Sequence, residues 1–261
     1  MTVKIILALR QKANVSIDVF QKKCKEERGP LIASLQTSLR LVKYVQNHRQ
    51  CDKSDDELRS VRPNLISSES PFDVIEEFCI DDTDDGFARS FRSQREVWKV
   101  LRDACADFLD YSTSFFVLVE ERTLILPGSP DMIMASEYNS INKAVAFAVS
   151  STNSNGAQYW MRSHSTTTQR WGPALGLKKY AQNVPYDHDV LNELSEGFGT
   201  VRPRYDICAT MWFDGNAQFG NAYVKALAAI REDEDSGFLT PKSMTTSLVK
   251  EHIFVDKYRT W

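Results

Sequence analysis

One phrase occurs twice in this chain, and the repetition constrains the fold more than any other feature. LRLVKYVQNH occupies residues 39–48, and LGLKKYAQNV occupies residues 175–184. Six of the nine positions from Leu39 to Asn47 are identical in the second copy. Internal repetition on this scale indicates duplicated structural units. We therefore expect two halves with the same order of strands and helices.

Further pairs of segments match in the same order along the chain. They are VKIILALR (3–10) with KAVAFAVS (143–150), VRP (61–63) with VRP (201–203), FDVIEEFCIDD (72–82) with YDICATMWFDG (205–215), and FFVLVEE (115–121) with TSLVKEH (246–252). Short apolar runs ended by polar residues predict strands. The order expected in each half is strand, helix, strand, loop, strand, helix, strand.

Two helices are expected in each half. The first begins near Ser16, whose hydroxyl can cap it, and its spacing turns Ile17, Phe20 and Cys24 to one face. The second is expected over residues 88–108 in one half and 216–230 in the other. The residues expected to face inward on these later helices are Val97, Leu101, Phe108, Phe219, Tyr223, Leu227 and Ile230.

This pattern predicts an α+β fold of two ferredoxin-like βαββαβ halves, packed sheet to sheet as a fused dimeric α+β barrel. The expected boundaries are a first domain over 1–125, a linker over 126–141 and a second domain over 142–261. The linker contains the apolar run MIMAS, so part of it is expected to pack. The alternative is a single mixed α+β domain in which the similarities arose by chance.

Composition narrows the classes of partner. The net charge of -3 offers no basic field for nucleic acid, and the apolar runs are too short to span a membrane. The five cysteines are scattered without metal-ligand spacing, which favours a reducing, cytoplasmic location. Neither a phosphate-binding loop nor a metal motif occurs, so no cofactor and no metal are expected.

Several of these segments resemble EthD-domain proteins of the dimeric α+β barrel superfamily. The resemblance is carried by VKIILALRQKANVSIDVFQKKCKEERGPL, YWMRSHS, KKYAQN and YDICATMWFDG, and it spans nearly all of both halves. The second half keeps Trp160 and His164 at the positions of the family's Trp and His. The first half has Cys24 and Arg28 there, so the two pockets are not equivalent. The resemblance implies cofactor-free chemistry on small, often aromatic or polyketide-like molecules.

The candidate residues follow from this resemblance and from side-chain chemistry. His164 is the expected acid–base group, Tyr180 a donor to an enolate oxygen, and Asp206 a carboxylate that orients the histidine. The residues expected to bind substrate are Trp160, Trp212, Arg28, His48 and Tyr44. Each also has a purely structural interpretation, such as turn building by Asp206, core packing by the aromatic residues or a surface ion pair between Arg28 and Glu26 or Glu27.

The leading functional hypothesis is a cofactor-independent lyase, isomerase or cyclase that acts on a hydrophobic polyketide- or terpenoid-like intermediate. The alternatives are a cofactor-free oxygenase of an activated phenol or anthrone, and a small-molecule binding protein without catalysis. The expected partner is a hydrophobic small molecule, not nucleic acid or membrane. The chain is expected to form a pseudo-dimer by itself, with further self-association left open. The segment NLISSESP (64–71) is expected to form either a lid or a surface loop, and the charged VEER and VKEH flanks are expected to be exposed.

Overall fold

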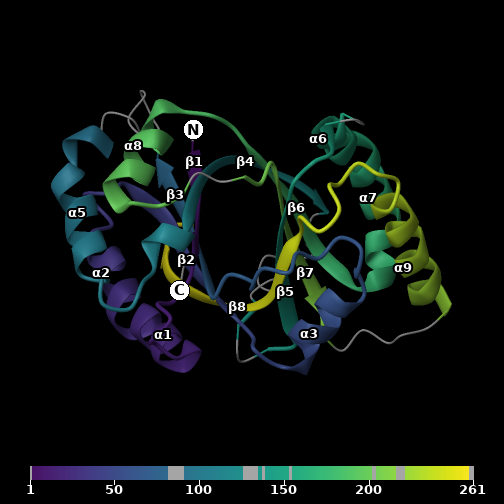
Figure 1. The fold of residues 1–261 in the computed structure, drawn as a ribbon, viewed down its shortest axis with the longest axis horizontal. Helices are drawn as coiled ribbons and strands as arrows, with labels where there is room; N and C mark the ends of the chain where they lie inside the picture. The colour runs from purple at the N-terminus through teal and green to yellow at the C-terminus, as the bar shows by residue number, and fades with distance from the viewer. Residues whose placement is uncertain are drawn as a thin grey trace.

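Eight strands form the centre of the molecule. The computed structural model describes residues 2–81, 91–125, 135–136, 139–152, 155–201, 204–215 and 221–258. The strands close into one barrel in the order β1-β3-β2-β8-β5-β7-β6-β4, and all neighbours are antiparallel. Figure 1 shows the barrel in the middle, with helices on both sides. The prediction of an α+β barrel is confirmed at this level.

Each half of the chain contributes four strands in the same spatial order. The strands are β1 (Thr2–Leu9), β2 (Leu41–Arg49), β3 (Val74–Asp81), β4 (Phe115–Ile125), β5 (Ile141–Ala148), β6 (Leu177–Pro185), β7 (Ile207–Asp214) and β8 (Thr245–Asp256). The first half reads β4-β1-β3-β2 and the second β8-β5-β7-β6. Pairing of β2 with β8 and of β4 with β6 closes the barrel. Closure leaves none of the eight described strands with an unpaired edge, which removes a common site of aggregation.

Helical segments lie on the outer face of each half. They are α1 (Ile17–Lys23), η1 (Cys24–Arg28), α2 (Gly29–Ser34), α5 (Arg95–Asp103) and η3 (Tyr111–Thr113) in the first half, and α6 (Gly156–Tyr159), η6 (Trp160–His164), α7 (Ser165–Trp171), η7 (Gly172–Leu175) and α9 (Asn221–Glu234) in the second. The Ser16 hydroxyl accepts a hydrogen bond from the amide of Val19, so the predicted cap is confirmed. Segments η1 and η6 are π-helical. This conformation is rare in proteins, but where it occurs it is often found at a functional site.

The later helices differ from the prediction in their bounds. Helix α5 is shorter than the predicted range, of which residues 88–90 lie outside the described residues, and α9 continues one turn beyond Ile230. Leu101, Phe108 and Ile230 are buried as expected. Phe219 and the side chain of Tyr223 lie outside the described residues.

Two helices that were expected as loops are exchanged between the halves. Helix α8 (Asp189–Phe198) follows β6, yet its side chains join the hydrophobic core of the first half. Helix α3 (Lys53–Ser60) follows β2 and lies against β8, where the Asp55 carboxylate accepts a hydrogen bond from the amide of Leu248. In Figure 1, α8 lies beside α5, and α3 lies below β7 and α9. Each half is therefore covered in part by a helix of the other.

The interior of the barrel contains a network of charges, in which Lys4, Glu77, Lys143 and Glu251 are buried and Glu121 is exposed. Lys4 pairs with Glu121 at 2.6 Å, and Lys143 pairs with Glu251 at 2.7 Å. Glu77 lies between them and binds Lys4 at 2.7 Å and Lys143 at 2.5 Å. Although burial raises it, the ammonium groups of Lys143 and Lys4 hold the pKa of Glu77 well below its ordinary value. The carboxylates therefore neutralise two lysines that belong to different halves.

The strand registers correct the sequence alignment by one residue. Thr2 pairs with Asp81 and Ile141 with Asp214, so Lys4 and Lys143 are equivalent positions. The glutamates that pair with them, Glu121 in VEER and Glu251 in VKEH, are also equivalent by register. Glu251 is buried, so the expectation that the VKEH flank is exposed is wrong at this position. The charge of Glu251 is compensated by Lys143 on another strand, so the local sequence around Glu251 does not indicate that it is buried.

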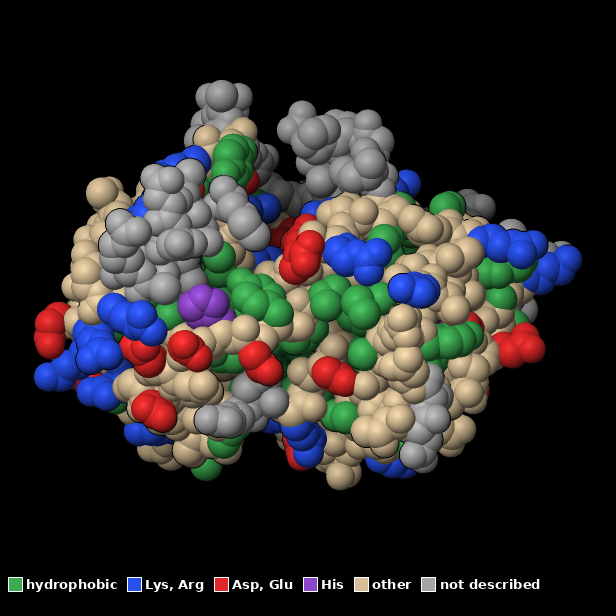
Figure 2. Space-filling view, turned by 90° about the horizontal axis from the view of Figure 1, so that it is seen from above, with side chains coloured by type: hydrophobic (Ala, Val, Ile, Leu, Met, Phe, Trp, Pro, Cys, Tyr) green, Lys and Arg blue, Asp and Glu red, His purple; other side chains and the backbone are tan. Residues whose placement is uncertain are grey.

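Part of the linker packs as expected. Ala135 is fully buried beside Trp212 and Ala181, and its amide donates to Glu251. The described side chains on the face in Figure 2 carry both signs of charge around a hydrophobic strip. All five cysteines are free thiols. In the described ranges, no helix has the length and apolar character needed to cross a membrane.

We expect the Glu77→Ala variant to be strongly destabilised, because it leaves two lysines with too little negative charge in the barrel. Breaking a buried ion pair typically lowers the free energy of unfolding by about 3–5 kcal/mol. Urea denaturation checks this value. Glu26→Ala is the control, since Glu26 pairs with Lys22 at the surface, and its effect is expected to stay below about 1 kcal/mol. Equal small effects would contradict the role of Glu77.

Glu121 predicts a loss of stability in acid. The charge of Lys4 lowers the pKa of Glu121 from 4.5 to about 2. A depressed pKa in the folded state stabilises the protein above the unfolded value, and this contribution disappears as the pH falls from 4.5 to about 2. Glu121→Gln is therefore expected to be less stable than wild type at pH ~7 and to match it near pH ~2. Urea denaturation across this range tests the convergence, and a constant difference would contradict it.

Candidate active site

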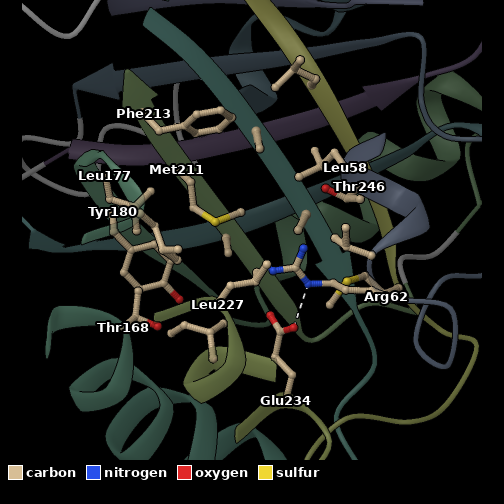
Figure 3. Close-up of a pocket in the computed structure, with 18 of the residues that line it drawn as sticks. Leu58, Arg62, Thr168, Leu177, Tyr180, Met211, Phe213, Leu227, Glu234 and Thr246 are labelled. Carbon is tan, nitrogen blue, oxygen red and sulfur yellow. Dashed lines mark hydrogen bonds and ion pairs between the residues drawn. The ribbon is translucent and has the colours of Figure 1, made fainter. Parts of the chain in front are cut away.

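A cavity of about 550 Å³ lies between the outer face of the second-half sheet and its helices. Its floor comes from alternate residues of the strands, and its walls come from η6, α7, α9 and the exchanged helix α3. The floor residues are Ala144, Ala146, Ala148, Leu177, Tyr180, Ile207, Ala209, Met211 and Phe213. Figure 3 shows the side chains around this space. A mostly apolar lining with few polar groups is typical of sites for small hydrophobic molecules.

Small residues explain why the space lies in the second half. The registers make Leu7 of β1 equivalent to Ala146 of β5, and Ile5 and Leu9 are likewise replaced by alanines. The exchanged helices strengthen the difference. Helix α8 inserts Phe198 against Trp98 and Phe116 in the first half. The polar helix α3 lines the cavity with Ser54, Glu57, Leu58 and Ser60, so Leu58 is its one apolar residue there.

His164 lies at the end of η6 and lines this cavity, as predicted. Its Nδ1 is 2.6 Å from an Asp233 carboxylate oxygen, and its Nε2 is 3.3 Å from the Thr168 hydroxyl. Partial burial raises the pKa of Asp233, but hydrogen bonds from His164 and Tyr159 bring it below its ordinary value. An ionised carboxylate at Nδ1 fixes the tautomer that leaves the lone pair on Nε2. This arrangement suits His164 to accept a proton.

Tyr180 also lines the cavity, on β6. Its hydroxyl is buried and makes no hydrogen bond to the residues that the structure describes. Burial raises the pKa of this phenol, so it remains a hydrogen-bond donor at neutral pH. Figure 3 shows the hydroxyl beside Thr168. A buried donor without a partner is costly, and a ligand oxygen in the cavity could satisfy it.

An ion pair between the halves closes another part of the wall. Arg62, which follows α3, donates to Glu234 at the end of α9 at 2.7 Å. In Figure 3 this pair lies across the cavity from Tyr180 and Thr168. Within the 64–71 insertion, Leu65 and Ser67 are hydrogen-bonded to Met244 of the wall. These bonds hold this part of the insertion against a residue of the cavity wall.

Three expected substrate-binding residues lie elsewhere, in a buried cluster of the first half. Arg28 donates to both oxygens of Glu76 at 2.8 Å, and the Tyr44 hydroxyl donates to Glu76 at 2.6 Å. His48 Nε2 is 2.9 Å from the Gln46 side-chain oxygen. Burial and the neighbouring His252 lower the pKa of His48 to about 3. Arg28, Tyr44 and His48 therefore fill the first-half cleft, and the surface pair expected for Arg28 is replaced by a buried one.

Two other predictions need correction. Asp206 accepts hydrogen bonds from the amide and hydroxyl of Ser150 and so joins the segment after β5 to the start of β7, while Asp233 takes the expected place beside His164. Trp212 points into the barrel, where its indole donates to Glu251 and Lys143 lies over its ring. Strand alternation puts its neighbours Met211 and Phe213 on the cavity side instead. Trp160, in contrast, lines the cavity as predicted.

Sequence reasoning missed Asp233 and the alanines of the floor. Asp233 lies three residues beyond the predicted end of its helix, so the prediction did not place it near His164. The alanines have a clearer signal in the sequence, because the equivalent positions in the other copy of the repeat are occupied by larger residues. Among the described residues, no group of three or more His, Cys, Asp or Glu gathers in a way that could hold a metal ion.

Comparison with known proteins relates this chain to others through structure. No protein-family model and no curated protein matches the sequence. An anthrone oxidase-like protein superposes with a TM-score of 0.52 and 7% identity, over 100% of this chain and 96% of that one. Proposed monooxygenases from Lactobacillus acidophilus NCFM (TM-score 0.46, 7% identity, 98% and 96% covered) and Fusobacterium nucleatum subsp. nucleatum ATCC 25586 (0.49, 5%, 97% and 93%) also match. At this identity, the first likeness supports the fold alone.

Exchanging residues between the two halves tests the origin of the cavity. Leu7→Ala is expected to lower the free energy of unfolding by about 2–5 kcal/mol, because it opens a void in a filled core. Ala146→Leu is expected to cost less than about 1 kcal/mol, since the added side chain enters existing space. Urea denaturation of both variants measures the difference. Equal costs would show that the second-half cleft has no room for a larger side chain.

Proposed function

We propose that the second-half cavity binds a planar, hydrophobic molecule with an acidic C–H or O–H group and that His164 removes its proton. The observation that carries this proposal is the Asp233–His164 pair beside the unpartnered Tyr180 hydroxyl in an apolar cavity. A histidine whose tautomer is fixed by a carboxylate is a suitable general base near neutral pH. The Tyr180 hydroxyl is suited to stabilise the negative oxygen that forms.

The reaction that we favour is oxygenation of an activated phenol or anthrone by O₂. Proton removal gives an electron-rich enolate, which reduces O₂ and forms a C–O bond as a peroxide. His164 returns its proton to the peroxide and then removes the second hydrogen from the same carbon as hydroxide leaves. In sum, a CH₂ group and O₂ give a ketone and water, so one oxygen atom enters the product. No group beyond the base and O₂ is required.

The second candidate is an oxygen-independent lyase, isomerase or cyclase. The same Asp233–His164 pair favours it, because proton transfer alone is sufficient for such reactions. Both candidates share the first step and differ only in the fate of the enolate.

We also propose that the chain is a tandem duplication of EthD-like domains, each half a ferredoxin-like βαββαβ unit. Support comes from the repeated strand order and from the matching positions of η1 and η6. Outside the two exchanged helices, each half follows the order strand, helix, strand, strand, helix, strand.

Oxygen uptake with anthrone as substrate tests the function. Wild type is expected to consume O₂ and anthrone together, and His164→Ala to reduce the rate by about 10²–10⁴-fold, the usual contribution of a general base. Asp233→Asn is expected to lower kcat by about tenfold or more and leave KM unchanged, because Asp233 positions the base. A purely structural role of Asp233 would change both constants.

The control is His188→Asn, a histidine that caps α8 and can be replaced by another capping residue. Its rate is expected to equal that of wild type. Anthrone consumption at the same rate under nitrogen would favour the lyase or isomerase instead. Binding without consumption, equal in wild type and His164→Ala, would overturn the catalytic role and indicate a binding protein.

A further inference from the structure

The two halves hold the same polar framework, but only the first half completes it. Gln46 donates to the carbonyl of Cys24 at 2.9 Å, and Gln182 donates to the carbonyl of Trp160 at 2.7 Å. Across the neighbouring strand, Gln46 pairs with Glu76, and Gln182 pairs with Ala209. The two halves therefore contain equivalent clefts, one with a carboxylate at this position and one without.

In the first half the Glu76 carboxylate is the centre of the framework. It accepts hydrogen bonds from Arg28 at 2.8 Å, from the Tyr44 hydroxyl at 2.6 Å and from Gln46 at 3.2 Å. The Gln46 side-chain oxygen is in turn satisfied by His48. These contacts satisfy Tyr44, Gln46 and the carboxylate together.

In the second half the carboxylate is missing, and the cavity lies beside Ala209, Tyr180 and His164 instead. Ala209 takes the place of Glu76, His164 that of Arg28 and Val184 that of His48. As a result, the Tyr180 hydroxyl and the Gln182 side-chain oxygen, both fully buried, are without partners among the described residues. In the first half, the Tyr44 hydroxyl has Glu76 as its partner, and the Gln46 side-chain oxygen has His48.

We infer that the ligand of the second half carries an ionised oxygen, an enolate, phenolate or carboxylate, that lies above Ala209 where the first half has the Glu76 carboxylate. The Tyr180 hydroxyl donates to this oxygen, as Tyr44 does to Glu76. His164 replaces the fixed charge of Arg28 by a group that becomes cationic when it takes a proton. The first half is thus an internal copy of the occupied site.

This inference deepens the proposed function and relies on it only for the location of the site. It names the chemistry of the substrate: a flat apolar body that fills the alanine-lined floor and one anionic oxygen at its edge. Neutral hydrocarbons of the same size would leave Tyr180 unpaired and bind more weakly. Leaving a buried donor unpaired is costly, and this cost is the basis of discrimination.

Equilibrium binding of anthracene probes under nitrogen tests the inference without turnover. Wild type is expected to bind anthracene-2-carboxylate at least about tenfold more tightly than its methyl ester, as expected for a hydrogen bond to a charged group. Tyr180→Phe is expected to lose about 10–100-fold in affinity for the carboxylate and to keep that for the ester. 2-Anthrol, titrated through its own ionisation, separates a phenolate from a carboxylate preference.

Tyr44→Phe is the matched control, because it makes the same change in the first half and is expected to leave probe binding unaffected. Ala209→Glu supplies an internal carboxylate and is expected to exclude the anionic probe, and Ala209→Glu/His164→Arg is expected to rebuild the first-half pair and restore any lost stability. Equal affinity of wild type for carboxylate and ester, or equal effects of Tyr44→Phe and Tyr180→Phe, would overturn the inference. Selective binding of the carboxylate probe without oxygen uptake would contradict the proposed oxygenase reaction and leave this inference standing.

Discussion

The fold depends on Glu77, a single carboxylate inside the barrel that pairs with a lysine from each half. The inward faces of both halves carry a lysine, and two ammonium groups inside a closed barrel need negative charge nearby. Glu77 supplies it to both Lys4 and Lys143, while its equivalent in the second half is Thr210, which accepts a hydrogen bond from Asn183. One carboxylate therefore bridges two copies of the same lysine. This shared contact links the two sheets across the barrel, and their outer faces in turn form the floors of the two clefts.

The two clefts show how one scaffold yields a packed core and a cavity. In the first half, leucine and isoleucine cover the sheet, Glu76 pairs with Arg28, and an apolar helix from the other half completes the packing. In the second half, alanines replace the large residues, and the covering helix is polar. Each change removes volume or a partner, and together they produce the space beside His164. The space comes chiefly from smaller side chains, and its polar groups include His164 with Asp233, Thr168 and the Arg62–Glu234 ion pair.

The repeat made the order of the strands predictable, and the hydroxyl of Ser16 made the first helix cap predictable. The positions of Trp160 and His164 came from the family resemblance, and that of Tyr180 from the repeated phrase and the resemblance together. Trp212 was misplaced for a different reason, since a strand offers two faces and one step along it exchanges the barrel side for the cavity side. Asp206 lies just before β7, where it binds Ser150 instead of His164. The buried Glu251 and the partner of His164 escaped prediction because their contacts join residues far apart in the chain. Exposure of a charged segment is a local expectation, and here distant lysines cancel the charge.

The exchange of α3 and α8 gives the linker a meaning beyond joining two domains. A chain cut between the halves would leave each fragment without the helix that covers its sheet, and with strand edges that pair only with the other fragment. We therefore expect neither fragment to fold by itself. The half that carries the cavity and the half that is filled therefore depend on each other for their covering helices and strand partners.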